Sequence, residues 1–202
     1  MRSLEEPELE EASGCRGWTN GDLIFHMLLD TQRALVACNS PGTPPADRNF
    51  VDYWTAWSAD HVDARAHARF VRISAAAHGD PNIICQRWLL TSQAALRCCS
   101  DAPTDYIATQ GHVLATSDFI ATLVVEAAIH HLDLVRHLKE KAGPAPAAAE
   151  LSAATLDGLL GAPRPAGWDD ISYLLKGTGR QPLSEEDRYA LGERASRFPL
   201  FS

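Results

Sequence analysis

The chain has 202 residues, of which 46% are hydrophobic and 22% are charged, and its formal net charge at pH 7 is -8. These proportions are typical of a soluble globular protein, and the length leaves no room for two full-sized enzymatic domains. An acidic chain repels nucleic-acid phosphates unless its basic residues gather on one face. No basic block stands out in the sequence, so we expect no nucleic-acid partner.

The N-terminal region and the cysteines indicate a cytoplasmic protein. Residues 4–11 are dominated by glutamate, unlike a signal peptide, and no apolar run reaches membrane-spanning length. The five cysteines are odd in number and lack CxxC spacing, which argues against a disulfide framework and against a cysteine zinc site. We therefore expect no association with a membrane, and buried free thiols for most of the cysteines.

Helical patterns predominate from the N-terminus onward. Apolar residues recur at intervals of three and four, and alternating apolar runs bounded by Asn-Gly or Asp-Gly are absent, so the predicted fold class is all-α. Thr19 and Asn20, followed by Asp22, have the pattern of an N-cap and an acidic first turn. They predict a helix to about Cys38, and the prolines that follow predict a loop over residues 39–49.

Two further helices are expected before residue 103. The first covers about residues 60–78 and ends at Gly79-Asp80-Pro81, where Pro81 begins the second. The predicted buried side of the first helix carries Val62, Ala66, Phe70, Ile73 and Ala77. The predicted buried side of the second carries Ile84, Trp88, Leu89, Ala95 and Leu96. The aromatic cluster Tyr53, Trp54 and Trp57 either packs in the core or lines the mouth of a pocket.

The rest of the chain predicts one long helix and a shorter extension. Residues 104–115 are expected to be a connection, after which Thr116 or Ser117 caps the longest helix, running to about Lys141. Short helical patterns then cover residues 151–160, 171–175 and 184–195. The last roughly 35 residues are too few to bury a core of their own. We expect a helical core over residues 1–143 and a helical extension, residues 144–202, docked on it.

Glu126 and His130 are the first candidates for chemistry, because residues four apart on a helix project from the same face. Their helix is very apolar, and an unpaired carboxylate buried there would cost several kcal/mol, so something must compensate for Glu126. A divalent metal is one solution, and a Glu–His hydrogen bond on a partly exposed face is the alternative. His26 lies within the apolar stripe of the first clear helix. It is either a third ligand or a core histidine whose ring nitrogens have hydrogen-bond partners.

Two segments resemble the signature segments of the mycothiol-dependent maleylpyruvate isomerase family within the DinB-like superfamily. They are residues 15–28, CRGWTNGDLIFHML, and residues 124–135, VVEAAIHHLDLV. The matching residues are Trp18, Thr19, Asp22, Leu23 and His26 in the first segment, and Glu126, His130, Asp133 and Leu134 in the second. The resemblance covers residues 14–140 and rests on the spacing of both segments.

The resemblance implies a DinB-like four-helix bundle in which His26, Glu126 and His130 hold one divalent ion and leave a position open. Zn²⁺ suits such a site best, although nickel, iron and manganese accept the same ligands. In this family the open position takes mycothiol. The reactions of the family include cis-trans isomerisation of a substrate by reversible addition of the thiol, and transfer of the thiol to small electrophiles. Family members have a full helix before the Trp-Thr pair. Here we expect the C-terminal extension or a second subunit, in a homodimer, to complete the bundle.

We therefore expect a mycothiol-dependent thiol transferase or isomerase that needs a metal and acts on a small electrophilic metabolite. Two alternatives stay open: a metal-dependent hydrolase or lyase of specialised metabolism that uses bound water, and a non-catalytic DinB-like binding protein. The sequence has neither a GxSxG motif nor a complete glycine-rich phosphate motif, which argues against serine-hydrolase and nucleotide chemistry.

Four other residues have expected roles near this centre. Asp133 is placed to hold a ligand histidine, and Arg180, in a Gly-Thr-Gly-Arg turn, either meets an anionic substrate or makes a helix-end contact. His131 lies about 100 degrees around the helix from His130, so we expect it to pack or to form an outer hydrogen bond. His137 should lie beyond the reach of the metal.

Overall fold

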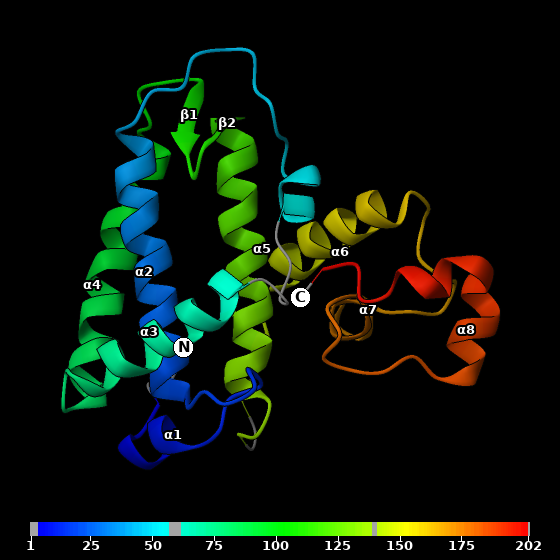
Figure 1. The fold of residues 1–202 in the computed structure, drawn as a ribbon, viewed down its shortest axis with the longest axis horizontal. Helices are drawn as coiled ribbons and strands as arrows, with labels where there is room; N and C mark the ends of the chain where they lie inside the picture. Colours follow the sequence, from blue (N-terminus) through cyan, green and yellow to red (C-terminus); the bar gives the residue numbers. More distant parts are fainter. Residues whose placement is uncertain (1–3, 57–61, 139–140, 202) are drawn as a thin grey trace.

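The computed structural model describes residues 4–56, 62–138 and 141–201 (Figure 1), so Trp57 lies outside the described residues. The described chain is mainly helical, as predicted, with one small two-stranded sheet. The helices are α1 (Glu6–Glu10), α2 (Asn20–Cys38), α3 (Val62–Ala76), α4 (Pro81–Ser100), α5 (Thr116–Val135), α6 (Pro146–Leu160), α7 (Asp170–Gly177) and α8 (Glu185–Leu191). Two 3-10 helices, η1 (Asp52–Ala56) and η2 (Gly192–Arg197), and the strands β1 (Tyr106–Thr109) and β2 (His112–Ala115) complete the fold.

The long helix α2 lies between α4 and α5 and contacts both of them (Figure 1). The shorter α3 contacts α2 and α4. Fully buried side chains of α2, such as Leu23 and Leu28, join one apolar cluster with Val71 of α3 and Ile84 of α4. This packing establishes a helical core around α2, while the finer expectation of a four-helix bundle stays a prediction.

The predicted start of α2 is confirmed. The Thr19 hydroxyl accepts a hydrogen bond from the backbone N–H of Asp22 at 3.1 Å, and the Asp22 carboxylate accepts one from the N–H of Thr19 at 3.0 Å. This capping box satisfies two N–H groups that a helix otherwise leaves unpaired at its N-terminus. It fixes where the helix begins and therefore where His26 sits along it.

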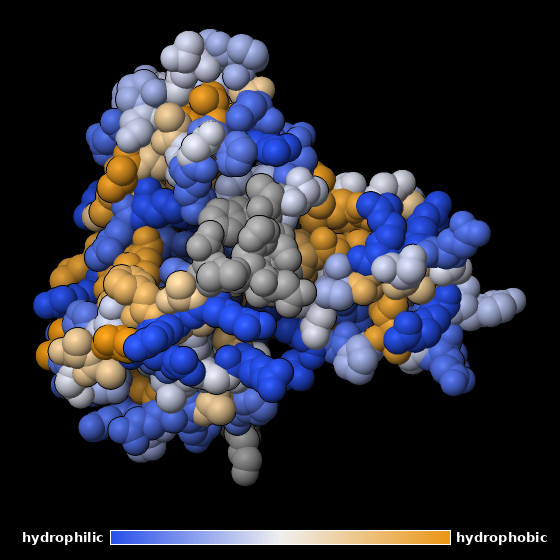
Figure 2. Space-filling view, viewed as in Figure 1, coloured by the Kyte–Doolittle hydropathy of each residue, from blue (hydrophilic) through white to orange (hydrophobic). Residues whose placement is uncertain are grey.

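The predicted buried faces of α3 and α4 are wrong in part. Phe70 and Ile73 are 52% and 58% exposed, whereas Val71 and Ala75 are buried. On α4, Ile84 and Ala95 are buried as expected, but Leu89 and Leu96 are exposed and Trp88 is partly buried. Each helix is covered by described residues on one side only, so apolar side chains reach the surface on the side of the molecule where α4 lies (Figure 2).

Residues 104–115, predicted as a connection, contain an antiparallel hairpin in which Tyr106 pairs with Ala115 and Thr109 with His112. Its turn residues Gln110 and Gly111 have φ of 50° and 81°, the left-handed conformation that a two-residue hairpin turn requires. The hairpin was not predicted because the usual signal for such a turn is Asn-Gly, whereas this turn has Gln-Gly. The strand leads directly into α5, so the predicted cap by Thr116 or Ser117 is wrong: the N-cap is Ala115. The helix ends at Val135, earlier than the predicted Lys141.

The C-terminal helices pack on the core. Helix α6 contacts α5, and α7 contacts α6. Buried Leu156 of α6 and Leu174 of α7 share one cluster with Val125 of α5, and Phe201 stacks on Trp54 with ring centroids 4.6 Å apart. The extension therefore buries its apolar residues against the core, and the boundary at residue 143 remains our prediction.

The cysteines are free thiols as expected, but Cys38 alone among the five is fully buried. The other four are only partly buried, so the prediction of burial for most of them is wrong. In the part of the chain that the structure describes, every helix is too short or too polar to cross a lipid bilayer.

Candidate metal centre

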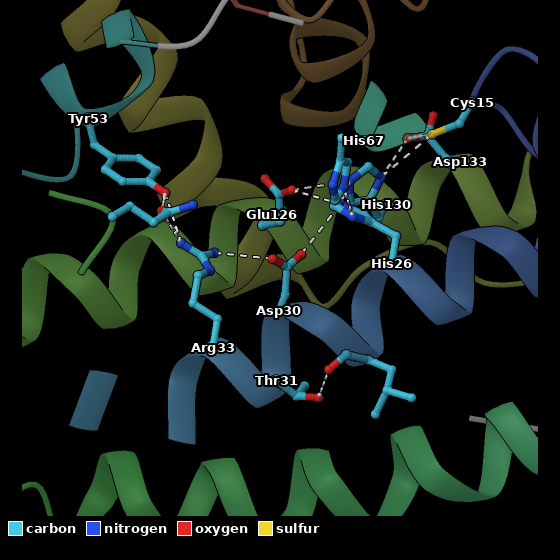
Figure 3. A network of polar contacts seen from close by, with 12 residues as sticks. Cys15, His26, Asp30, Thr31, Arg33, Tyr53, His67, Glu126, His130 and Asp133 are labelled. Carbon is cyan, nitrogen blue, oxygen red and sulfur yellow. Dashed lines mark hydrogen bonds and ion pairs between the residues drawn. The ribbon is translucent and has the colours of Figure 1, made fainter. Parts of the chain in front are cut away.

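His26, Glu126 and His130 meet between α2 and α5 (Figure 3). The Nε2 atom of His26 lies 3.2 Å from Oε1 of Glu126 and 3.1 Å from Nε2 of His130. The distance from His130 Nε2 to Glu126 Oε1 is 3.3 Å. Glu126 and His130 are one turn apart on α5, and the packing of α2 against α5 supplies His26. Three ligand atoms from distant parts of the sequence thus converge on one point.

These separations fit a shared divalent ion. Bonds of about 2.0–2.1 Å place neighbouring ligands about 3.3–3.4 Å apart in a tetrahedron and about 2.9 Å apart on an octahedral face. The observed 3.1–3.3 Å falls between these values. Two imidazoles and one carboxylate are also the donor set of catalytic zinc sites that keep one position open. The residues present therefore suit the metal, and their geometry allows more than one first-row ion.

The other ring nitrogen of His130 contacts Asp133. His130 Nδ1 lies 3.0 Å from Asp133 Oδ2, so the ring can donate there and turn Nε2 toward the centre. Burial works to raise the pKa of Asp133, but the hydrogen bonds from His130 and Arg180 outweigh it and hold that pKa well below its usual range. Asp133 is thus placed to orient His130, and its role as the partner of a ligand histidine stays a prediction.

Arg180 binds Asp133 through two hydrogen bonds. Its Nε donates to Oδ1 at 2.8 Å and its Nη2 to Oδ2 at 2.7 Å, while Nη1 donates to the carbonyl of Thr178 at 3.1 Å. The side chains are 16% and 1% exposed, so the pair is well shielded from water. Arg180 therefore neutralises Asp133, and three of its five N–H groups are engaged within the chain.

Cys15 is a residue at the site that sequence reasoning missed. Its thiol donates to Asp133 Oδ2 at 3.2 Å and lies 3.7 Å from His130 Nδ1. Cys15, His130 and Asp133 form a second group of potential ligands among the described residues. Arg180 already places a positive charge on the same carboxylate and would repel a cation there, so the group with His26 and Glu126 is the better metal site.

His67 of α3 approaches the centre from the opposite side of His26. Its Nε2 lies 3.3 Å from His26 Nδ1 (Figure 3). Burial and the neighbouring His26 lower the pKa of His67, which favours a neutral ring that can accept a hydrogen bond. Such a bond would keep Nε2 of His26 free for the centre. No spacing in the sequence signals His67, because only the packing of α3 on α2 brings it there.

Asp30 is one turn beyond His26 on α2, and its Oδ2 lies 3.5 Å from His26 Nε2. Apart from this approach, Oδ2 has no hydrogen-bond partner among the described residues. Burial, and next the charge of Glu126, raise the pKa of Asp30. The carboxylate therefore faces the centre with one oxygen unoccupied. It was detectable in the sequence only as an acidic residue four positions after His26.

Arg33 links Asp30 to the hairpin. Its Nη2 lies 3.3 Å from Asp30 Oδ1, while its Nη1 donates to the Tyr53 hydroxyl at 2.8 Å and to Oε1 of Gln110 at 2.7 Å. Tyr53 and Gln110 are also hydrogen-bonded to each other. Tyr53 is 3% exposed, so its ring packs in the core. The turn of the hairpin is thereby tied to the residues around the centre.

His131 and His137 belong to neither group of potential ligands among the described residues. His131 is partly buried, and burial lowers its pKa. His137 is exposed beyond the end of α5. Both histidines therefore lie outside the candidate metal centre.

Comparison with known proteins gives one result. A family model described as the mycothiol maleylpyruvate isomerase N-terminal domain matches residues 1–135, about two thirds of the chain. The matched segment contains His26, Glu126, His130 and Asp133, whereas Arg180 lies outside it. No curated protein and no solved structure shows a significant match.

Proposed function

The chain belongs to the mycothiol maleylpyruvate isomerase N-terminal domain family, and on this basis we propose that it is a metal-dependent thiol transferase or isomerase. Its co-substrate would be mycothiol, and its substrate a small electrophilic metabolite. The convergence of His26, Glu126 and His130 within 3.1–3.3 Å carries the proposal, because it provides a metal site in the part of the chain that the family model covers.

In this proposal His26, Glu126 and His130 hold one divalent ion, with Zn²⁺ the best match. When bound there, such an ion supplies Lewis acidity that lowers the pKa of a neighbouring thiol and so yields a thiolate nucleophile near neutral pH. Asp133 orients His130, and His67 orients His26. Arg180 balances the charge of Asp133. We further propose that α2, α3, α4 and α5 correspond to a DinB-like bundle on which residues 144–202 dock as an extension.

Asp30 has a proton-transfer role in the same scheme. Its Oδ2 is unoccupied beside His26 and can accept the proton that a thiol releases as it approaches. The same oxygen would orient a water molecule if the protein were a hydrolase or lyase, which makes that the second candidate function. Turnover that is indifferent to mycothiol would favour this second candidate.

The experiment that tests the proposal combines metal analysis with a thiol-transfer assay. Protein purified without chelator is expected to contain about one divalent metal per chain and to consume mycothiol when an electrophile such as monochlorobimane is added. His26→Ala should lose both the metal and the turnover, while His131→Ala, the matched control, should keep both. Wild-type protein without metal would remove the basis of the proposal.

A further inference from the structure

A pocket of about 280 Å³ lies between α2, α4 and α5, next to the candidate metal centre. Its walls are mostly apolar and include Met27, Trp88, Leu96, Ile120, Leu123 and Val124. Asp30 and Glu126 also line it. The pocket therefore has an apolar body that is continuous with the place where chemistry is proposed to occur.

The charges around the pocket select against an anionic ligand. Of the described residues that line it, none is basic, while Asp30 and Glu126 are acidic. Two arginines lie near the centre, and both are engaged: Arg180 with Asp133, and Arg33 with Asp30, Tyr53 and Gln110. An anionic group in the body of the pocket, away from the proposed metal ion, would lose its hydration without gaining a positive partner, which is costly in an apolar environment.

We propose that this pocket binds the uncharged, apolar part of the substrate, with the electrophilic carbon of that substrate directed toward the metal centre. The proposal rests on the proposed function and specifies its substrate class: a neutral electrophile with an aliphatic or aromatic group. A dry cavity of about 150 Å³ accommodates benzene, so 280 Å³ has room for a group of roughly ten carbon atoms.

A small molecule suits this pocket better than a second copy of the chain. Asp30 and Glu126 belong both to the pocket lining and to the candidate metal centre, so a second protein seated on the pocket would lie against that centre. The lining that a ligand would touch is almost entirely apolar. The volume is near the lower end of the range for small-molecule sites.

Calorimetric titration of the metal-loaded chain with 1-alkanols of increasing length tests the inference. Affinity should increase about threefold to fourfold with each added methylene until the pocket is full, and then level off. Alkane-1-sulfonates of the same length should bind the metal-free chain at least about tenfold more weakly than the alkanols bind it, because the lining of the pocket offers no cation. Affinity that is independent of chain length, or equal for alkanols and sulfonates, would overturn the proposal.

Three variants locate the binding. Leu96→Ala should weaken alkanol binding about tenfold, whereas the matched control Leu90→Ala should not change it. Both leucines lie on α4, and they are 69% and 67% exposed, but Leu96 lines the pocket and Leu90 does not. Ser92→Trp should fill the space and abolish binding. If Ser92→Trp bound alkanols as tightly as wild type, the ligand would lie outside this pocket and the inference would be wrong.

Two further arms separate this inference from the proposed function. His26→Ala should lose metal yet still bind alkanols, because His26 does not line the pocket. Wild-type protein that binds metal but no alkanol refutes the pocket while the proposed function stands. Wild-type protein that binds alkanols but no metal refutes the function while the apolar site stands. A third outcome is wild-type protein that binds no alkanol and sediments with a larger mass than Leu96→Ala does. This outcome would show that a second copy of the chain occupies the pocket.

Discussion

The guanidinium of Arg180 and the carboxylate of Asp133 form a two-bond ion pair between positions 47 residues apart. Asp133 also accepts the hydrogen bond that orients His130. The C-terminal extension therefore reaches the candidate metal centre through one residue, from outside the segment that the family model covers.

Arg180→Met should lower the free energy of unfolding by about 3 kcal/mol, because it leaves the Asp133 carboxylate, 1% exposed, without its guanidinium partner. Urea denaturation of the metal-free chain measures the change. Arg194→Met, at an exposed arginine of η2, is the control and should stay within about 0.5 kcal/mol of wild type. Adding Asp133→Asn to Arg180→Met should restore part of the loss. A loss below about 0.5 kcal/mol in Arg180→Met would contradict the buried pair.

Gly14→Ala should destabilise the chain by about 1–3 kcal/mol, because a Cβ at Gly14 would lie 2.5 Å from Asp133 Oδ1 and 2.8 Å from its Cα. The backbone N–H of Gly14 also donates to the carbonyl of Asp133 at 2.8 Å, so the loop cannot retreat without losing that bond. Gly143→Ala is the control, since its Cβ would meet Leu132 at an ordinary 3.7 Å. Equal melting temperatures for the two variants would show that the loop is not packed this closely.

His67→Phe should weaken zinc binding about tenfold or more, because partners of ligand histidines contribute about 10–100-fold to metal affinity. Competition with a chromophoric zinc chelator measures this without reference to activity. His67→Gln should recover part of the affinity, since its amide oxygen can accept the bond from His26 Nδ1. His137→Ala, at an exposed position, should behave as wild type. If His67→Phe binds zinc as tightly as His137→Ala, His67 does not position His26.

Zinc affinity should rise with pH from about pH 6.5, the ordinary pKa of a histidine, up to the raised pKa of His130. Burial opposes protonation of His130, but its hydrogen bonds to Asp133, Cys15 and Glu126 outweigh burial and raise its pKa well above the ordinary value. Below that raised pKa the metal-free chain carries a proton that zinc must displace, so affinity should fall about tenfold for each pH unit of acidification. Above it the dependence should disappear. Competition titrations across this range would contradict the prediction if affinity were flat.

The sequence predicted the helical elements well where local chemistry fixes them. The Thr19–Asp22 capping box and Pro81 after Asp80 are signals carried by neighbouring residues, and both helices begin where these signals stand. The hairpin turn was missed because Gln110 adopts a positive φ, which is uncommon for glutamine and therefore cannot be predicted from the residue type. The buried side of α3 was wrong because Phe70 and Val71 are equally apolar, and only the position of α2 decides which one is covered.

The candidate ligands emerged in two ways. Glu126 and His130 are visible as a pair four residues apart, but His26 required the resemblance to a family, since 100 residues separate it from Glu126. Asp30, His67 and Cys15 have no recognisable spacing, because their approach to the centre depends on how α2, α3 and the loop before α2 pack. Arg180 was noticed for its turn, and its partner Asp133 could be identified only from tertiary structure.

Arg33 connects the hairpin to the surroundings of the candidate metal centre. One guanidinium divides its hydrogen bonds between Asp30, beside His26, and the pair Tyr53 and Gln110. Gln110 belongs to the hairpin turn, so the conformation of that turn and the position of the Asp30 carboxylate depend on the same side chain. A single cation therefore holds together residues 77 positions apart and joins the end of the sheet to the candidate centre.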